Sequence, residues 1–165
     1  GEIGLDYHYD NTDREKQIMV FRKQLDIAQK YNKPIIVHSR DSIQDTYNIL
    51  KEYNLKGSIH CFSGSVEMAR EFIKLGYKIG IGGIITYKNA KTIKEVVKDT
   101  NLAYILLETD SPYLAPVPHR GEDNSPKYIP IIADEIASIK GTSGLDIARV
   151  TTANAEAVFD FSCEK

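Results

Sequence analysis

The chain has 165 residues, which predicts a single domain that buries about two-thirds of its unfolded surface. Its 21 Lys and Arg against 23 Asp and Glu give a net charge of −2, so any anion-binding site must be local. No apolar run approaches the ~18 residues of a membrane-spanning helix, and we expect no membrane partner. Cys61 and Cys163 make no metal-type pair, which favours a reduced, cytoplasmic setting.

The chain opens in a strand-like segment with neither a signal peptide nor an initiator methionine, which predicts that an N-terminal part is missing. Short apolar or β-branched runs predict five strands, at 1–6, 34–37, 57–59, 77–83 and 104–107. Apolar spacings of three and four predict helices at 12–31, 43–53, 65–75, 89–99, 128–140 and 143–161. Thr12 and Glu15 form a capping box, Ser65 is a candidate N-cap, Gly141 is a stop signal, and the last helix is expected to break near Ala153.

Strands that alternate with helices imply right-handed crossovers and a parallel sheet. The fold class is therefore α/β, a partial TIM barrel of five strands with flanking helices. A complete barrel of this type uses about 250 residues. The sheet is thus either open or completed by another chain, and its exposed edges favour a homodimer.

Four ligand-type side chains accompany the predicted strands: Glu2, His38, His60 and Asp110. Singly, each has a plainer interpretation: a solvated charge, two structural histidines and a turn cap. Together they are expected to meet, because parallel strands place their carboxyl ends on one face. Two imidazoles and two carboxylates suit Zn²⁺, Mn²⁺ or Mg²⁺, so the sequence predicts a divalent-metal site.

Four further residues are candidates for holding a phosphate or bordering the site. Arg40 either grips it with its guanidinium or pairs with Asp41. His119, Arg120 and Asn124 follow Asp110 in a proline-containing loop, where they either rim the site or belong to ordinary surface.

Asp6 and His8 have a similar pair of interpretations, lining the mouth of the site or lying exposed in a loop. The 10 tyrosines fall mostly at positions typical of a core, so no stacking platform is predicted.

Six motifs resemble the TatD family of metal-dependent deoxyribonucleases, within the amidohydrolase-like TIM barrels. They are GEIGLDYH (1–8), PIIVHSRDS (34–42), IHCFSGS (59–65), LLETDSPYLAP (106–116), PHRGEDNSP (118–126) and TTANAEAVF (151–159). They match the family in order and spacing over nearly the whole chain. The first and fourth are the most specific.

The resemblance implies that Glu2, His38, His60 and Asp110 are metal ligands and that the substrate is DNA, cleaved from a strand end. It further implies that Glu2 bridges two ions and that Asp110 accepts a proton from the attacking water. Arg120 and Asn124 would lie in a loop that borders the phosphate site. With Arg40, proposed above from its position after His38, they are the candidate substrate-binding residues. The chain would be one domain, residues 1–165, forming the C-terminal two-thirds of such a barrel.

One family feature has no counterpart: the family's first three strands are absent, and no His-x-His pair occurs in this sequence. The resemblance therefore implies two ions in the intact family site and either one or none here. Two rival hypotheses remain. One is an amide- or lactone-cleaving hydrolase of the wider superfamily. Such a barrel usually has a carbamylated lysine or an extra histidine among its ligands, and no lysine lies at a predicted strand end here. The other is an inactive fragment that binds metal or assembles with a partner.

Overall fold

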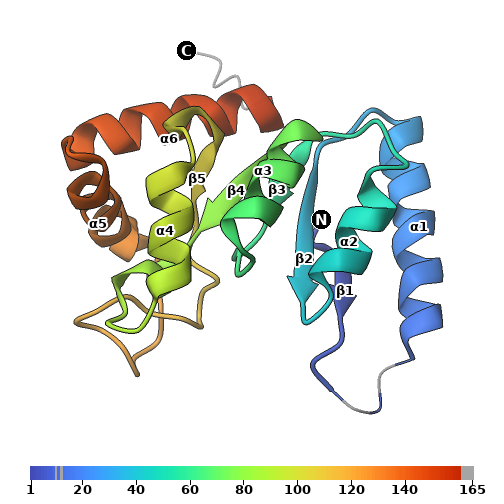
Figure 1. Cartoon of the computed structure of the whole chain (residues 1–165), viewed down its shortest axis with the longest axis horizontal. Coiled ribbons are helices and arrows are strands. Elements are labelled where there is room, and N and C mark those ends of the chain that lie inside the picture. Colours follow the sequence, from blue (N-terminus) through green and yellow to red (C-terminus); the bar gives the residue numbers. More distant parts are fainter. Residues whose placement is uncertain (10, 12, 161–165) are drawn as a thin grey trace.

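The computed structural model describes residues 1–9, 11 and 13–160, and its centre is one parallel sheet in the order β1-β2-β3-β4-β5. The strands are β1 (Ile3–Asp6), β2 (Ile35–Arg40), β3 (Gly57–Ile59), β4 (Tyr77–Ile81) and β5 (Ile105–Leu107). Sequential strands are neighbours throughout, and helices connect them along one side of the sheet (Figure 1). The predicted α/β architecture, an open sheet of five parallel strands with flanking helices, is confirmed.

The α-helices are α1 (Arg14–Lys30), α2 (Ile43–Leu50), α3 (Val66–Lys74), α4 (Lys91–Asp99), α5 (Ile129–Lys140) and α6 (Gly144–Phe159). Three 3-10 helices are η1 (Gly83–Thr86), η2 (Leu102–Tyr104) and η3 (Pro126–Tyr128). Within the described part of the chain, each helix is too short or too polar to cross a bilayer.

The helix ends test the predicted capping residues. Ser65 accepts a hydrogen bond from Met68 N at the start of α3, and Gly141 ends α5 in the left-handed conformation, both as predicted. Helix α1 is capped by Asp13, which accepts from Lys16 N, one residue later than expected, and Thr12 lies outside the described residues.

Helix α6 runs without the break expected near Ala153. The next side chain, Asn154, donates to Leu102 O (2.7 Å) and Ile105 O (2.9 Å), and these bonds tie the helix to η2 and β5.

Two rows of residues across the sheet divide its faces. Register pairs the apolar side chains Ile3, Val37, Ile59, Ile79 and Ile105, and the last four are at most 1% exposed in the core beneath the helices. Successive strand residues point to opposite faces. The next residue on each strand therefore faces away from this core, and these residues are Gly4, His38, His60, Gly80 and Leu106. The second row carries the two predicted imidazoles, with a glycine on each side.

Candidate metal centre

The four predicted ligands form one continuous series of contacts. Nδ1 of His38 lies 2.9 Å from Oε1 of Glu2, and the same carboxylate oxygen lies 3.9 Å from Nε2 of His60. Nε2 of His60 lies 3.1 Å from Oδ1 of Asp110. Groups from the first and the last strand regions therefore meet at one place on the sheet.

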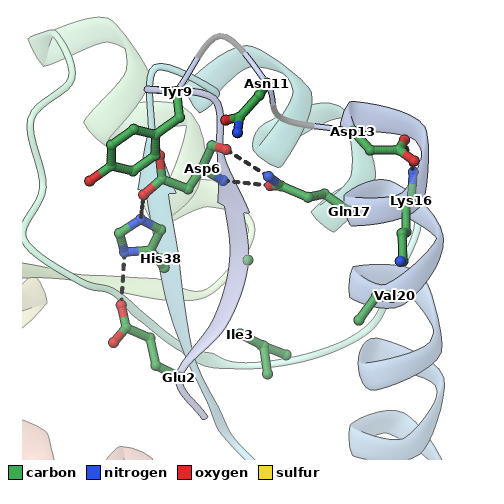
Figure 2. Close-up of a pocket in the computed structure, with 11 residues that line it drawn as sticks. Glu2, Ile3, Asp6, Tyr9, Asn11, Asp13, Lys16, Gln17, Val20 and His38 are labelled. Carbon is green, nitrogen blue, oxygen red and sulfur yellow. Dashed lines mark hydrogen bonds and ion pairs between the residues drawn. The ribbon is translucent and has the colours of Figure 1, made fainter.

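The position of Glu2 differs from the expectation that each ligand ends a strand. His38 lies inside β2, His60 follows β3 directly, and Asp110 follows β5, but Glu2 comes immediately before β1. Asp6 occupies the end of β1, and its Oδ2 lies 3.0 Å from Nε2 of His38. The His38 ring is thus held between two carboxylates from the two ends of β1, as Figure 2 shows.

Gly4 makes this arrangement possible. It pairs with His38 in the register, and a Cβ at this position would overlap the carbonyl of His38. A residue with a side chain would push β1 away from β2 and separate the carboxylates of Glu2 and Asp6 from the imidazole.

Asp6 is supported from two directions. Its burial favours the neutral acid, but hydrogen bonds from the His8 N–H and from His38 outweigh that effect and lower the pKa of Asp6. Its backbone is held by Gln17, whose Nε2 donates to Asp6 O (2.7 Å) and whose Oε1 accepts from Asp6 N (2.7 Å). Asp6 is therefore an ionised carboxylate in a fixed place, and a further candidate ligand.

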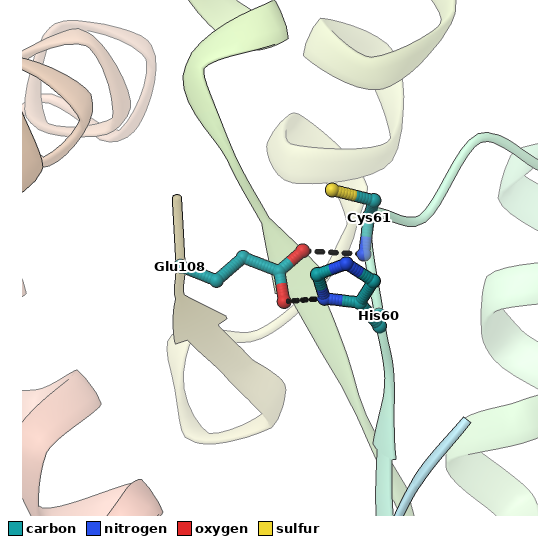
Figure 3. Close-up of side chains that lie close together, drawn as sticks. All are labelled: His60, Cys61 and Glu108. Carbon is teal, nitrogen blue, oxygen red and sulfur yellow. Dashed lines mark hydrogen bonds and ion pairs between the residues drawn. The ribbon is translucent and has the colours of Figure 1, made fainter. Parts of the chain in front are cut away.

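Sequence reasoning missed Glu108. Its Oε2 lies 2.8 Å from Nδ1 of His60, and its Oε1 accepts a hydrogen bond from the N–H of Cys61 (Figure 3). Glu108 and Asp110 are two residues apart at the exit of β5, and this spacing was the available signal. Only Asp110 was given a role. Glu108 binds the far nitrogen of His60, leaving Nε2 directed at Glu2 and Asp110.

Gly80 of β4 explains the space that Glu108 occupies. A Cβ on Gly80 would lie 2.7 Å from Oε2 of Glu108 and 2.9 Å from Oε1. In the described chain, β4 thus meets the carboxylate of Glu108 with its backbone and contributes no ligand.

The donor set fits a divalent ion of the borderline class. Imidazole and carboxylate together suit Zn²⁺ or Mn²⁺. One ligand atom each from His60, Cys61 and Glu108 lies within 4.8 Å of the others. Burial raises the pKa of the Cys61 thiol to about 11, so Cys61 is a weaker ligand than its neighbours at neutral pH. Hydrogen bonds with Cys61 and Glu108 raise the pKa of His60, and a metal must therefore displace a proton there.

A cavity of about 630 Å³ opens beside these groups. Its lining comes from β2, from the segments that follow β1, β3 and β5, and from η1 after β4: Tyr9, His38, Ser39, Arg40, His60, Cys61, Ser63, Ile84, Asp110, Tyr113 and Leu114. Arg40 is exposed in this lining, and Asp41, its alternative partner, contacts Nδ1 of His8 (3.1 Å) instead. Arg40 is accordingly placed to meet an anion that enters the cavity.

The loop after Asp110 differs from its predicted role. Asn124 is 6% exposed, and its Nδ2 donates to Thr109 O and Tyr113 O, both at 2.6 Å. Because both hydrogens of its amide are donated to these two carbonyls, Asn124 holds the turn at Asp110, and its amide group is not free to donate to a substrate.

Arg120 and His119 also lie outside the lining of the cavity. The guanidinium of Arg120 stacks 4.5 Å from the ring centroid of Tyr87, beside a separate pocket of about 480 Å³. His119 stacks on Tyr128 at 4.1 Å. That Arg120 contacts the phosphate stays a prediction, because its guanidinium lies over Tyr87 in a pocket that shares Tyr113 and Leu114 with the cavity.

Comparison with known proteins gives a consistent picture. The sequence model of the family described as TatD related DNase matches residues 1–160. The chain is 45% identical to the uncharacterized metal-dependent hydrolase YabD of Bacillus subtilis, over 96% of this chain and 64% of that protein. It is 39% identical to the uncharacterized metal-dependent hydrolase YcfH of Escherichia coli, over 100% of this chain and 63% of that protein. The chain thus spans slightly less than two-thirds of these relatives.

Solved structures agree on the fold. The crystal structure of YjjV, a TatD homologue from Escherichia coli, superposes with a TM-score of 0.92 at 34% identity, over 97% of this chain and 62% of that one. A TatD family hydrolase from Entamoeba histolytica gives a TM-score of 0.82 at 28% identity, over 96% and 62%.

Proposed function

Because this chain belongs to the TatD related DNase family, we propose that it provides the metal-binding part of a hydrolase that cleaves phosphodiester bonds of DNA, acting at a strand end. The relatives' names support a metal-dependent hydrolase, and the family description supports DNA as substrate.

The observation that carries the proposal is the convergence of Glu2, His38, His60 and Asp110 beside an open cavity. Chance does not readily place two imidazoles and two carboxylates from four strand regions within contact of one another. Such a set is what a divalent ion requires, and a bound ion would activate water and offset the charge that develops on a phosphate.

Each side chain has a role that follows from its contacts. Glu2 lies between the two imidazoles, where one carboxylate can serve two ligand groups at once. Asp110 Oδ1 lies at the edge of the cavity and is the site at which we place the proton taken from the attacking water. Arg40 is the cation of the lining, and we assign it to a non-bridging phosphate oxygen.

The test is cleavage of an end-labelled DNA oligonucleotide by the purified chain in Mn²⁺. Asp110→Asn and His60→Ala should each lower the rate at least about 100-fold, the order expected when a general base or a ligand is lost. Asp26→Asn, an exposed carboxylate on α1, is the matched control and should leave the rate unchanged. Equal rates in all four proteins would refute the assignment. No cleavage by the unmodified chain would favour the inactive metal-binding fragment.

The rival amide- or lactone-cleaving hydrolase gains no support from the lysine nearest the site strands. Lys78, in β4, donates to Ala103 O at 2.6 Å and lies over the ring of Tyr104. It is engaged near the start of β5, away from Asp110 at the other end, and so cannot take the place of a carbamylated ligand. Turnover of small lactones in the same Mn²⁺ assay, without cleavage of DNA, would reverse this conclusion.

A further inference from the structure

A thiol and a further carboxylate lie beside the His60 ring. One ligand atom each from His60, Cys61 and Glu108 lies within 4.8 Å of the other two, and Figure 3 shows the three side chains together. Of these groups, which we name the cysteine cluster, only the His60 ring has a role in the proposed function. The sulfur of Cys61 and the carboxylate of Glu108 are therefore ligand atoms that the proposed hydrolysis does not use.

The backbone that carries Cys61 is fixed on both sides. His60 N donates to Val37 O of β2 (2.8 Å), and Phe62 N donates to Gly80 O of β4 (3.1 Å). Two strands thus hold the residues that flank the cysteine. A ligand on a fixed backbone loses little conformational freedom when an ion binds, so the cysteine cluster is suited to bind one.

An ion can reach the cysteine cluster from solvent. His60 and Cys61 line the cavity of about 630 Å³ beside the metal centre. His60 and Glu108 line a second cavity of about 720 Å³, and their side chains are 14% and 17% exposed. Three protein ligands leave a tetrahedral ion one position for water, which these cavities can supply.

The sulfur decides which ion the cysteine cluster prefers. Thiolate is a soft ligand that selects soft cations, whereas Mg²⁺ and Mn²⁺ prefer oxygen ligands. A soft ion such as Cd²⁺ binds Cys61 as the thiolate, and the proton of the thiol passes to solvent. A hard ion gains little from the sulfur, so the carboxylates of Glu2 and Asp110 attract it more strongly.

His60 is common to the cysteine cluster and the metal centre. Its Nε2 lies 3.1 Å from Oδ1 of Asp110 and 3.9 Å from Oε1 of Glu2. Its Nδ1 lies 2.8 Å from Oε2 of Glu108. A neutral imidazole has one nitrogen free to bind a metal, because the other carries the proton. An ion in the cysteine cluster therefore either takes the nitrogen that faces Glu2 and Asp110 or leaves the proton on it.

We propose that His60, Cys61 and Glu108 form a binding site for a soft divalent cation, and that an ion bound there withdraws His60 from the metal centre and inhibits it. The inhibition of cleavage rests on the proposed function, whereas binding of the soft ion is measured without any cleavage.

The first experiment titrates the metal-free chain with Cd²⁺ and follows the ultraviolet charge-transfer band of the cadmium–thiolate bond. Cys61→Ser should abolish the band, and Cys61→Ala repeats this test without a hydroxyl group. The matched control is Cys163→Ser, which removes the chain's other cysteine and should keep the band. A band that is absent from the unmodified chain, or lost only in Cys163→Ser, would overturn the proposal.

A second comparison separates the cysteine cluster from the metal centre. The ring of His38 lies between Glu2 and Asp6, so His38 belongs to the metal centre and not to the cysteine cluster. His38→Ala should keep the Cd²⁺ band but bind Mn²⁺ at least about tenfold more weakly, whereas His60→Ala should weaken both ions. A band that needs His38 as much as His60 would show that Cys61 is one more ligand of the same centre and would refute a separate site.

Mutual exclusion of the two ions is the final test. Mn²⁺ at a concentration that saturates the unmodified chain should raise the Cd²⁺ midpoint of the band about tenfold, because coupling between two sites is reciprocal. The same Mn²⁺ concentration should barely move the midpoint of His38→Ala. An unchanged midpoint in the unmodified chain would refute the inhibition. A shifted midpoint in a chain that cleaves no DNA would instead refute the proposed hydrolase and leave the soft-ion site standing.

Discussion

Replacing Glu108 by glutamine should invert the tautomer of the neutral His60 ring, which is the form that binds a metal. The N–H of Cys61 needs an acceptor, and Oε1 of residue 108 is the oxygen that provides it. With the amide oxygen held there, the NH₂ group of the introduced glutamine would face Nδ1 of His60, where Oε2 of Glu108 now lies 2.8 Å away. Nδ1 would then accept, and the ring proton would move to Nε2. That nitrogen is directed at Glu2 and Asp110, so the variant places a proton where the metal should bind.

The size of the effect follows from the behaviour of such outer carboxylates. Loss of the partner that orients a ligating histidine typically costs 10–100-fold in metal affinity, or about 1.4–2.7 kcal/mol. We expect a change of this order for Mn²⁺ or Zn²⁺ in a calorimetric titration. Nitrogen-resolved NMR at a Zn²⁺ concentration that saturates only the parent should show the His60 ring with its proton on Nδ1 and a liganded Nε2 in the parent, and no such ring in Glu108→Gln.

Glu95→Gln is the control, because Glu95 is an exposed carboxylate on α4. It should bind metal like the parent. If Glu108→Gln also binds metal with unchanged affinity, or shows the parental tautomer, Glu108 does not orient His60 and the reasoning fails.

Three other predictions concern the scaffold. Gly4→Ala should lower the free energy of unfolding in urea by about 3 kcal/mol, because its methyl group would overlap the His38 carbonyl. The control Gly82→Ala, whose methyl group would make ordinary 3.8 Å contacts, should cost little, and equal stabilities of the two variants would contradict the close approach of β1 to β2. Asn124→Ala should lower the free energy of unfolding by about 2–4 kcal/mol, measured as a fall in Tm, because the carbonyls of Thr109 and Tyr113 lose their donor. A Tm within error of the parent would show that other contacts hold the loop. Within the described sheet, the outer strands β1 and β5 each have a strand neighbour on one side only, and their free backbone groups can pair with a second chain. Light scattering should therefore detect a concentration-dependent dimer, and a constant monomer mass up to high concentration would rule that association out.

The sheet was predictable because its signals are local. Strands such as Ile105–Leu107 are continuous apolar runs, and the helices show regular apolar spacing and recognisable caps at Ser65 and Gly141. Parallel order then follows from the alternation of the two element types. The expectation that His38, His60 and Asp110 meet follows from this topology alone.

What could not be predicted depends on contacts between segments distant in the sequence. Nothing near Glu108 indicates that Gly80 would leave room for its carboxylate, or that His60 would need a second partner. Asn124 illustrates the same limit. A polar residue in a loop looks like a candidate for substrate binding until the two carbonyls that occupy its amide are known.

A divalent ion bound among Glu2, His38, His60 and Asp110 is the feature on which the proposed activity depends most. Anomalous diffraction from crystals of the chain soaked in Mn²⁺ or Zn²⁺ tests it directly. We predict a peak within coordination distance, about 2.0–2.2 Å, of His60 Nε2 and at least one of these carboxylates. An anomalous peak only elsewhere on the surface, with these four side chains unliganded at saturating metal, would contradict it.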